Sequence, residues 1–186
     1  MRLRYVGKME VGMKKKKRTT RKMVLVAIMT ALSIAGRFIP MFKPVTAITT
    51  ITGAYLGVGS GFLVGALSAL LSNFYFGQGP WTPFQMLAWG MIGVLAGLLS
   101  KYIVKSRIVL MIFGLLTGIM YSLVMDVWTV IWYAKGFDIE LYKAAMITAI
   151  PHTVLYSVST VMFLWIMAKP FGEKLARIKI KYFAHC

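Results

Sequence analysis

Amide and aromatic side chains are concentrated in one uncharged segment, residues 73–90, which reads NFYFGQGPWTPFQMLAWG. Amides donate and accept hydrogen bonds without carrying a charge, and aromatic rings offer flat apolar walls. The side chains that this pattern marks as candidate ligand contacts are Asn73, Gln78, Trp81, Gln85 and Trp89. The chemistry that they predict is non-covalent binding of a neutral or planar small molecule.

The middle of this segment is expected to be a stiff turn. Pro80 and Pro83 fix the backbone and restrict the residues before them, while Gly77 and Gly79 permit a tight turn. We expect Trp81 to be presented from this turn, with an amide side chain on either side. An aromatic belt at a membrane surface is the alternative interpretation, but it explains only the aromatic residues and leaves the amides and prolines unexplained.

Ionisable residues inside apolar segments form a second group of candidates. Asp126 lies within MYSLVMDVWTVIWYA, where a charge in a membrane helix costs at least ~2.5–3.5 kcal/mol. Arg37 is its natural partner, and the two could form a buried clamp, contact a ligand, or do both. Trp128 could supply a wall that faces the amide-rich segment, and His152 is a further candidate contact in the last apolar segment.

Signatures of catalysis are absent from the sequence. It has no GxxxxGK[ST] phosphate-binding loop, no nucleophile elbow and no metal-ligand spacing around its two histidines. We therefore predict no enzyme activity, no cofactor and no metal. An intramembrane enzyme that uses Asp126 and His152 remains an alternative without a supporting motif.

The composition is that of an integral membrane protein. Hydrophobic residues make up 59% of the 186 residues and charged residues 15%, against roughly 45–50% and 25% in soluble domains. The net charge of +17 could indicate nucleic-acid binding. However, the basic residues gather in the first 22 positions, in residues 101–107 and after Ala168, as the positive-inside bias predicts for cytoplasmic segments. We therefore predict no nucleic-acid partner.

The fold class predicted is an all-α membrane protein, a single bundle of six transmembrane helices with both termini in the cytoplasm. The expected spans are 23–40, 45–57, 60–76, 83–100, 107–134 and 143–168, flanked by basic tails at 1–22 and 169–186. The second span is short for a crossing, so it should be tilted or buried among its neighbours. This topology places residues 73–90 on the outer side.

Small residues recur at four-residue spacing in several of these segments. Ala27, Ala31 and Ala35 would share one helix face, where another helix could approach closely. For this stripe, internal packing and a partner protein are both open. For the glycine pairs, internal packing is the favoured interpretation; these pairs are Gly61/Gly65, Gly93/Gly97 and Gly114/Gly118.

Together, the basic N-terminal tail, the Ala27-x-x-x-Ala31 motif, the six short spans and the GQGPWTPFQM segment resemble the substrate-specific S components of energy-coupling factor (ECF) vitamin transporters. The similarity covers nearly the whole chain. It implies a subunit in the plasma membrane of a bacterium that captures a vitamin or related micronutrient at the outer face of an ATP-driven importer. The GQGPWTP segment is similar to that of S components associated with cobalamin or its precursors.

The resemblance also implies partners. In that family the alanine face of the first helix meets a transmembrane coupling subunit, which is joined to two cytoplasmic ATPases, and Ala27, Ala31 and Ala35 fit this role. The competing interpretation is a non-transporting six-span scaffold of the cell envelope. A scaffold would explain the spans and the charge but not the amide-rich segment.

Overall fold

The structure is a computed structural model that describes the backbone of residues 2–39 and 44–183 and the side chains of residues 19–39 and 44–181. Parts of both predicted basic tails therefore lie outside the described residues. Within the described ranges the chain is helical and contains no strand, which confirms the all-α expectation. Its helices are α1 (Arg2–Gly36), α2 (Val45–Leu56), α3 (Val58–Phe76), α4 (Thr82–Leu98), α5 (Ser100–Ile103), α6 (Arg107–Ala134) and α7 (Ile139–Phe183).

Four helical segments are long and apolar enough to cross a membrane. They are Thr19–Gly36, Val58–Phe76, Arg107–Ala134 and Ile139–Lys181. The other two expected spans correspond to α2 and α4, which are apolar but shorter. Six crossings and cytoplasmic termini therefore stay a prediction. Of the two alternatives for the second span, tilted or buried among its neighbours, burial is confirmed, because every residue of α2 except Tyr55 is buried.

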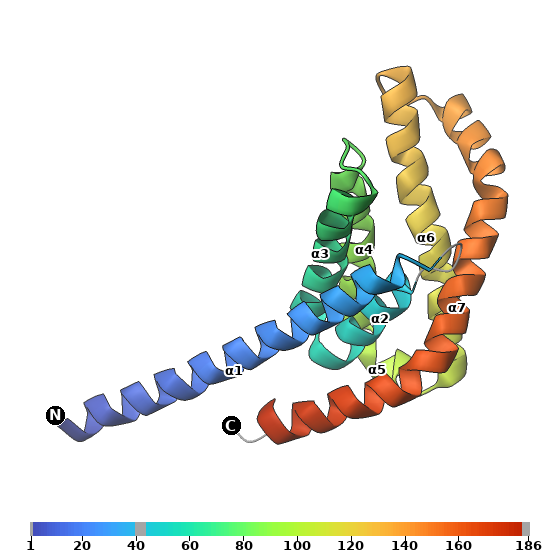
Figure 1. Ribbon diagram of the computed structural model, residues 1–186. Coiled ribbons are helices and arrows are strands. Elements are labelled where there is room, and N and C mark those ends of the chain that lie inside the picture. The colour runs from blue at the N-terminus through green and yellow to red at the C-terminus, as the bar shows by residue number, and fades with distance from the viewer. Residues whose placement is uncertain (1, 40–43, 184–186) are drawn as a thin grey trace.

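Two helix ends differ from the predicted spans. Helix α1 begins at Arg2 instead of residue 23, and α7 continues to Phe183 instead of ending at residue 168. Pro151 and Pro170 lie inside α7, and proline removes a backbone hydrogen bond without necessarily ending a helix. Figure 1 shows that the last part of α7 turns away from the preceding part and runs across one end of the molecule.

The helices surround α2, which packs against α1, α3, α4 and α7. Figure 1 shows α3 beside α4, and α6 beside α7, with α1 crossing obliquely. The connections 77–81 and 135–138 lie at one end, called here the loop end, while α5 and the last part of α7 lie at the other, called the basic end. Helix α2 meets α3 at Gly57, whose φ of +93° explains the glycine there.

Glycine contacts bring helix backbones together, as the four-residue spacing predicts. A Cβ atom built on Gly61 would lie 2.5 Å from the carbonyl oxygen of Gly93, and one on Gly65 would overlap the carbonyl of Trp89. Helices α6 and α7 meet in the same way, where Gly118 faces Ser157. The interpretation of these glycines as internal packing residues is confirmed.

We predict that Gly93→Leu lowers the free energy of unfolding by about 1–3 kcal/mol, because the new side chain must push against the α3 backbone. Thermal unfolding of the purified protein in detergent measures this. Gly59→Ala is the matched control, since an added Cβ at that helical position meets nothing within 4 Å. Equal melting temperatures for Gly93→Leu and the wild type would contradict the close approach.

Candidate functional site

Asn73 is the centre of a buried hydrogen-bond network near the loop end. It is 1% exposed, and its Oδ1 accepts a hydrogen bond of 2.8 Å from Nη1 of Arg37, which also donates to the hydroxyl of Ser72. The Nδ2 of Asn73 donates to Oγ1 of Thr82 and to Oε1 of Gln85, both at 2.9 Å. One amide therefore uses its acceptor and both donors to join α3 to α4 and to the residue after α1.

Three aromatic side chains stack beside this network. The ring of Tyr121 lies between that of Trp89, at 5.3 Å and 12°, and that of Tyr156, at 4.6 Å and 21°. Gln85 Nε2 donates to the Tyr121 hydroxyl at 2.9 Å, and Trp89 Nε1 donates to the Tyr156 hydroxyl at 2.8 Å. The hydroxyls of Tyr156 and Thr46 are also hydrogen-bonded. We call the connected set the amide–aromatic cluster: Arg37, Ser72, Asn73, Thr82, Gln85, Trp89, Tyr121 and Tyr156.

Local sequence explains how the α3 and α4 side chains of the cluster are positioned. Asn73 lies in the last turn of α3 and Gln85 in the first turn of α4, so the connection between them brings the two amides together. Gly77 begins that connection with a φ of +104°, which favours glycine. Gln85 and Trp89 are four residues apart on α4, so they share one face.

Arg37 brings a positive charge to the cluster. Its guanidinium lies 5.1 Å from the Trp89 ring centre and 4.9 Å from that of Phe76, distances at which cation–π attraction operates. Its Nε is buried and has no hydrogen-bond partner in the described part of the chain. The cluster therefore combines a cationic side chain that has one unused donor, two amides that hydrogen-bond to each other, and stacked rings. A flat molecule with oxygen or nitrogen acceptors along its edge would exchange hydrogen bonds with these groups.

The expected pair between Arg37 and Asp126 is wrong. Among the described residues, the ion pairs are Lys143–Glu140 and Arg177–Glu173. Arg37 follows α1, which packs on α2 and α3, so the guanidinium hydrogen-bonds to α3 side chains and does not pair with Asp126. Asp126 instead lines a mainly apolar groove between α6 and α7, with neighbours such as Leu123 and Ile150.

Trp81 and Gln78 lie at the rim of the cluster. Trp81 is 38% exposed, and its ring covers Gly79. The expectation that Trp81 lies between two amides is wrong, because those amides hydrogen-bond to each other in the interior. Gln78 is exposed, donates to the carbonyl of Leu70 at 2.9 Å, and accepts from Thr82 Oγ1 at 3.0 Å.

Trp128 and His152 flank the cluster from α6 and α7. Trp128 packs between Phe84 and Trp132, with ring centres at 5.3 and 5.2 Å. The exposed ring of His152 lies 6.0 Å from Tyr156, on which it stacks. Trp128 is therefore joined to α4 through Phe84, as the facing wall of the amide-rich segment was expected to be.

Sequence reasoning missed Ser72, Thr82, Tyr121 and Tyr156. The two tyrosines carried a usable signal, because each lies well inside an apolar segment, and a buried tyrosine hydroxyl requires a hydrogen-bond partner. Ser72 and Thr82 carried none, since hydroxyls in membrane helices usually bond to their own backbone.

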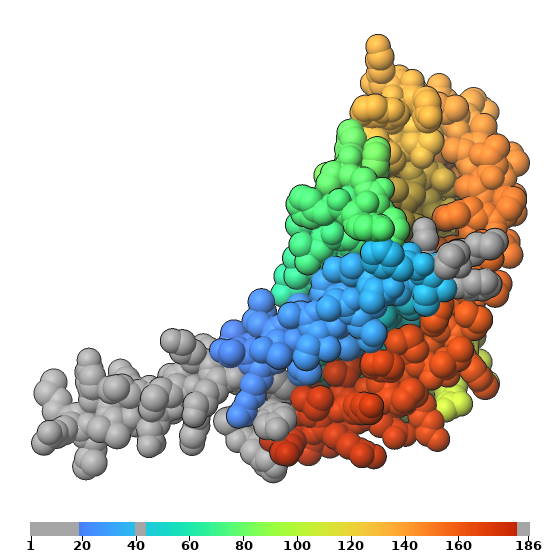
Figure 2. All heavy atoms as spheres, viewed as in Figure 1, coloured from blue at the N-terminus to red at the C-terminus, as the bar shows by residue number. Residues whose placement is uncertain are grey.

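The alanine stripe faces away from the bundle. Ala27, Ala31 and Ala35 are exposed, whereas Val26 and Met29 of the same helix are buried. Figure 2 shows the described part of α1 as the outermost layer of the molecule on this face. Internal packing, one of the two interpretations left open by the spacing, therefore does not apply to this stripe.

Comparison with known proteins gives one family. Residues 17–177 match the model of the family described as "ECF-type riboflavin transporter, S component". No curated protein and no solved structure matches the chain significantly. This family is a transporter family and not an enzyme family, and the apolar helices agree with a multi-pass membrane protein. Because the match covers most of the 186 residues, the chain belongs to the S-component family of ECF-type vitamin transporters.

Proposed function

We propose that this chain is the substrate-binding subunit of an ATP-driven ECF importer and that it binds its vitamin at the amide–aromatic cluster. In this proposal both termini, with the basic segments 1–22 and 169–186, are cytoplasmic, so that the loop end faces outward. The observation that carries the proposal is the convergence of Arg37, Asn73 and Gln85 on the stack of Trp89, Tyr121 and Tyr156.

The chemistry of the cluster favours a flat heteroaromatic vitamin of the flavin class. The rings of Trp89, Tyr121 and Tyr156 are nearly parallel, with interplanar angles of 12° and 21° between neighbours. A planar ligand could therefore stack on one of these rings in place of its present neighbour. The carbonyl and ring nitrogen edge of a flavin would match the guanidinium of Arg37 and the amides of Asn73 and Gln85. The description of the matching family, a riboflavin transporter component, supports the same class.

A corrinoid fits this cluster less well. It carries bulky groups on both faces of its ring, so it could not take the place of a closely stacked aromatic side chain. The similarity of the GQGPWTP segment to cobalamin-associated S components is therefore not carried into the proposal. Trp81, Gln78, Trp128 and His152 are proposed to cover the ligand from the rim, whereas Asp126, in a separate groove, is left out.

We predict that Trp89→Leu weakens riboflavin binding by about thirtyfold or more, since truncating a central aromatic contact costs roughly 2 kcal/mol. Quenching of flavin fluorescence on titration into the purified protein measures the dissociation constant. Trp165→Leu is the control, because that tryptophan is exposed and lies near the basic end beside Arg107.

A second variant tests the same site with a smaller change, in case Trp89→Leu does not fold. Tyr121→Phe keeps the stacked ring and removes only the hydroxyl that accepts from Gln85, and we expect a smaller loss of about fivefold. Unchanged riboflavin affinity in both variants, with wild-type affinity in the control, would contradict the site. Tight binding of cobalamin and none of riboflavin would contradict the ligand class.

The exposed alanine face of α1 is proposed to contact the coupling subunit, and through it two cytoplasmic ATPases. Small side chains let two helices approach closely in lipid, where hydrophobic attraction between helices is missing. The residues of this face are Ala27, Ala31 and Ala35, and no other helix of the described chain covers them.

We predict that Ala31→Trp abolishes co-purification with the coupling subunit and ATPases, because the indole holds the partner helix away. Vitamin binding by the isolated protein should be unchanged, since Ala31 points away from the cluster. Leu116→Trp, at an exposed position of α6, is the matched control for added bulk. Wild-type complex yields and uptake rates for Ala31→Trp would exclude this face as the contact.

A further inference from the structure

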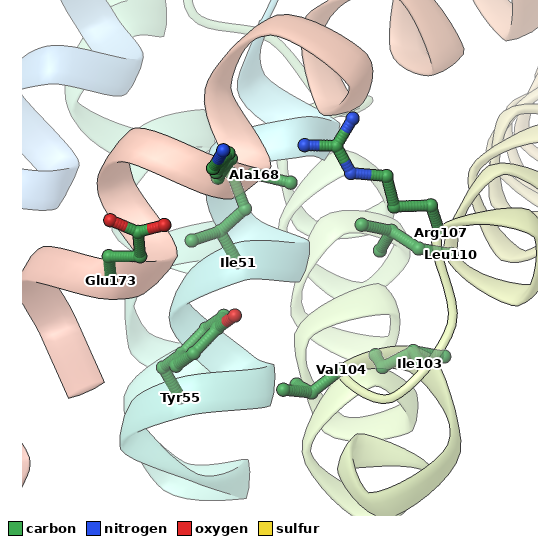
Figure 3. Close-up of a pocket in the computed structure, with 9 residues that line it drawn as sticks. Ile51, Tyr55, Ile103, Val104, Arg107, Leu110, Ala168 and Glu173 are labelled. Atoms are coloured by element: carbon green, nitrogen blue, oxygen red, sulfur yellow. The ribbon is translucent and has the colours of Figure 1, made fainter.

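A cavity lies at the basic end, far from the loop end. It has a volume of about 280 Å³ and is bounded by α2, by α5 and the residue after it, by the start of α6, and by the bend in α7. Figure 3 shows Arg107, Tyr55 and Glu173 on different sides of it, with the Tyr55 hydroxyl directed inward. Its lining residues are Ile51, Tyr55, Ile103, Val104, Arg107, Leu110, Ala168, Lys169 and Glu173.

A second, more open hollow adjoins this cavity. It shares Tyr55 and Val104 with the first and adds Lys101, Lys105 and Lys179. We call the two together the basic cleft. It is lined by five basic side chains and one carboxylate, that of Glu173, so an anion would meet a strongly positive site.

The cations of the basic cleft lack carboxylate partners in the described chain. The guanidinium of Arg107 lies over the ring of Trp165, 5.4 Å from its centre, and forms no ion pair. Lys169 likewise forms none, and the one carboxylate, Glu173, is 4.0 Å from Arg177. Uncompensated cations gathered around a concave surface are favourable for an external anion.

Two residues of the cleft lie where apolar sequence gives way to basic sequence. Arg107 is the first residue of the apolar segment Arg107–Ala134. Lys169 directly precedes Pro170, and from Lys169 onward basic residues recur along α7. Beyond this bend α7 keeps Leu175 buried in the protein core and exposes Lys174, so this part of the helix presents basic side chains on its outer face.

We propose that the basic cleft binds the phosphate group of an anionic phospholipid. Arg107 and Lys169 contact the phosphate, and Lys101, Lys105 and Lys179 surround the rest of the headgroup. Ile51, Ile103, Val104 and Leu110 line the apolar part of the cavity, where they contact the glycerol and the first acyl carbons. This site is separate from the amide–aromatic cluster and does not depend on which vitamin that cluster binds.

The apolar lining distinguishes a lipid from a soluble phosphate. A site for a free phosphate requires only hydrogen-bond donors, whereas four aliphatic side chains beside two cations suit an amphiphile whose charged and apolar parts are adjacent. Each basic side chain near a membrane surface strengthens the binding of anionic lipid by about fivefold. Removing two of them should therefore have an effect that is large enough to measure.

The test is native mass spectrometry of the full-length protein titrated with phosphatidylglycerol. Arg107→Gln together with Lys169→Gln should weaken its retention by about thirtyfold. Lys135→Gln together with Lys143→Gln removes the same charge in and next to the 135–138 connection at the loop end, and should leave retention unchanged. Phosphatidylcholine with the same acyl chains and glycerol 3-phosphate are run in parallel, and both should bind far more weakly.

Each contrary outcome overturns the proposal. Equal weakening by the two double variants would show attraction to overall charge and not to the cleft. Equal retention of phosphatidylcholine would exclude charge recognition, and equal binding of glycerol 3-phosphate would show a soluble anion site. Loss of the coupling subunit from the Arg107/Lys169 variant with unchanged lipid retention would show that the cleft is a protein contact. Riboflavin binding and thermal unfolding of each variant establish that the fold is intact.

Discussion

The close approach of α3 and α4 at their glycines is the constraint on which the rest of the structure depends. In a membrane, apolar side chains gain little by contacting each other instead of lipid, so helices must associate through close packing and polar contacts. Gly61 lies against Gly93, and Gly65 lies against the backbone of Trp89. This contact fixes the register of the two helices, and with it the positions of Asn73 on one and Gln85 on the other.

The register of α3 and α4 also determines how the hydrogen-bonding groups of the amide–aromatic cluster find partners. A buried amide is costly unless its donors and acceptors are used, and Asn73 uses its own on Arg37, Thr82 and Gln85. The hydrogen bonds then continue through Gln85 to Tyr121, so that polar groups from separate helices satisfy one another. A ligand that enters this cluster has to offer equivalent partners, and this requirement is a physical basis for selectivity.

The two ends of the molecule differ in their chemistry. At the loop end the recognition groups are mostly neutral, apart from Arg37, and they are buried among aromatic rings. At the basic end the side chains are cationic and surround an open cleft. The proposed planar ligand and the proposed anionic headgroup therefore have separate places on the same bundle, and the exposed alanine face of α1 is a third surface that neither site includes.

The sequence by itself determined the all-α membrane class, the apolar segments, the internal role of the paired glycines and the amide-rich segment 73–90. These follow from composition and from short-range spacing, which act through a single helix. The partner of Arg37 was decided only by the tertiary structure. The sequence offered Asp126 because it is the one acid within the spans expected from the sequence, but α1 packs on α3, so the guanidinium reaches Asn73. The stack of Trp89, Tyr121 and Tyr156 was also beyond the sequence, because its members come from three helices whose relative rotation is set by packing between them.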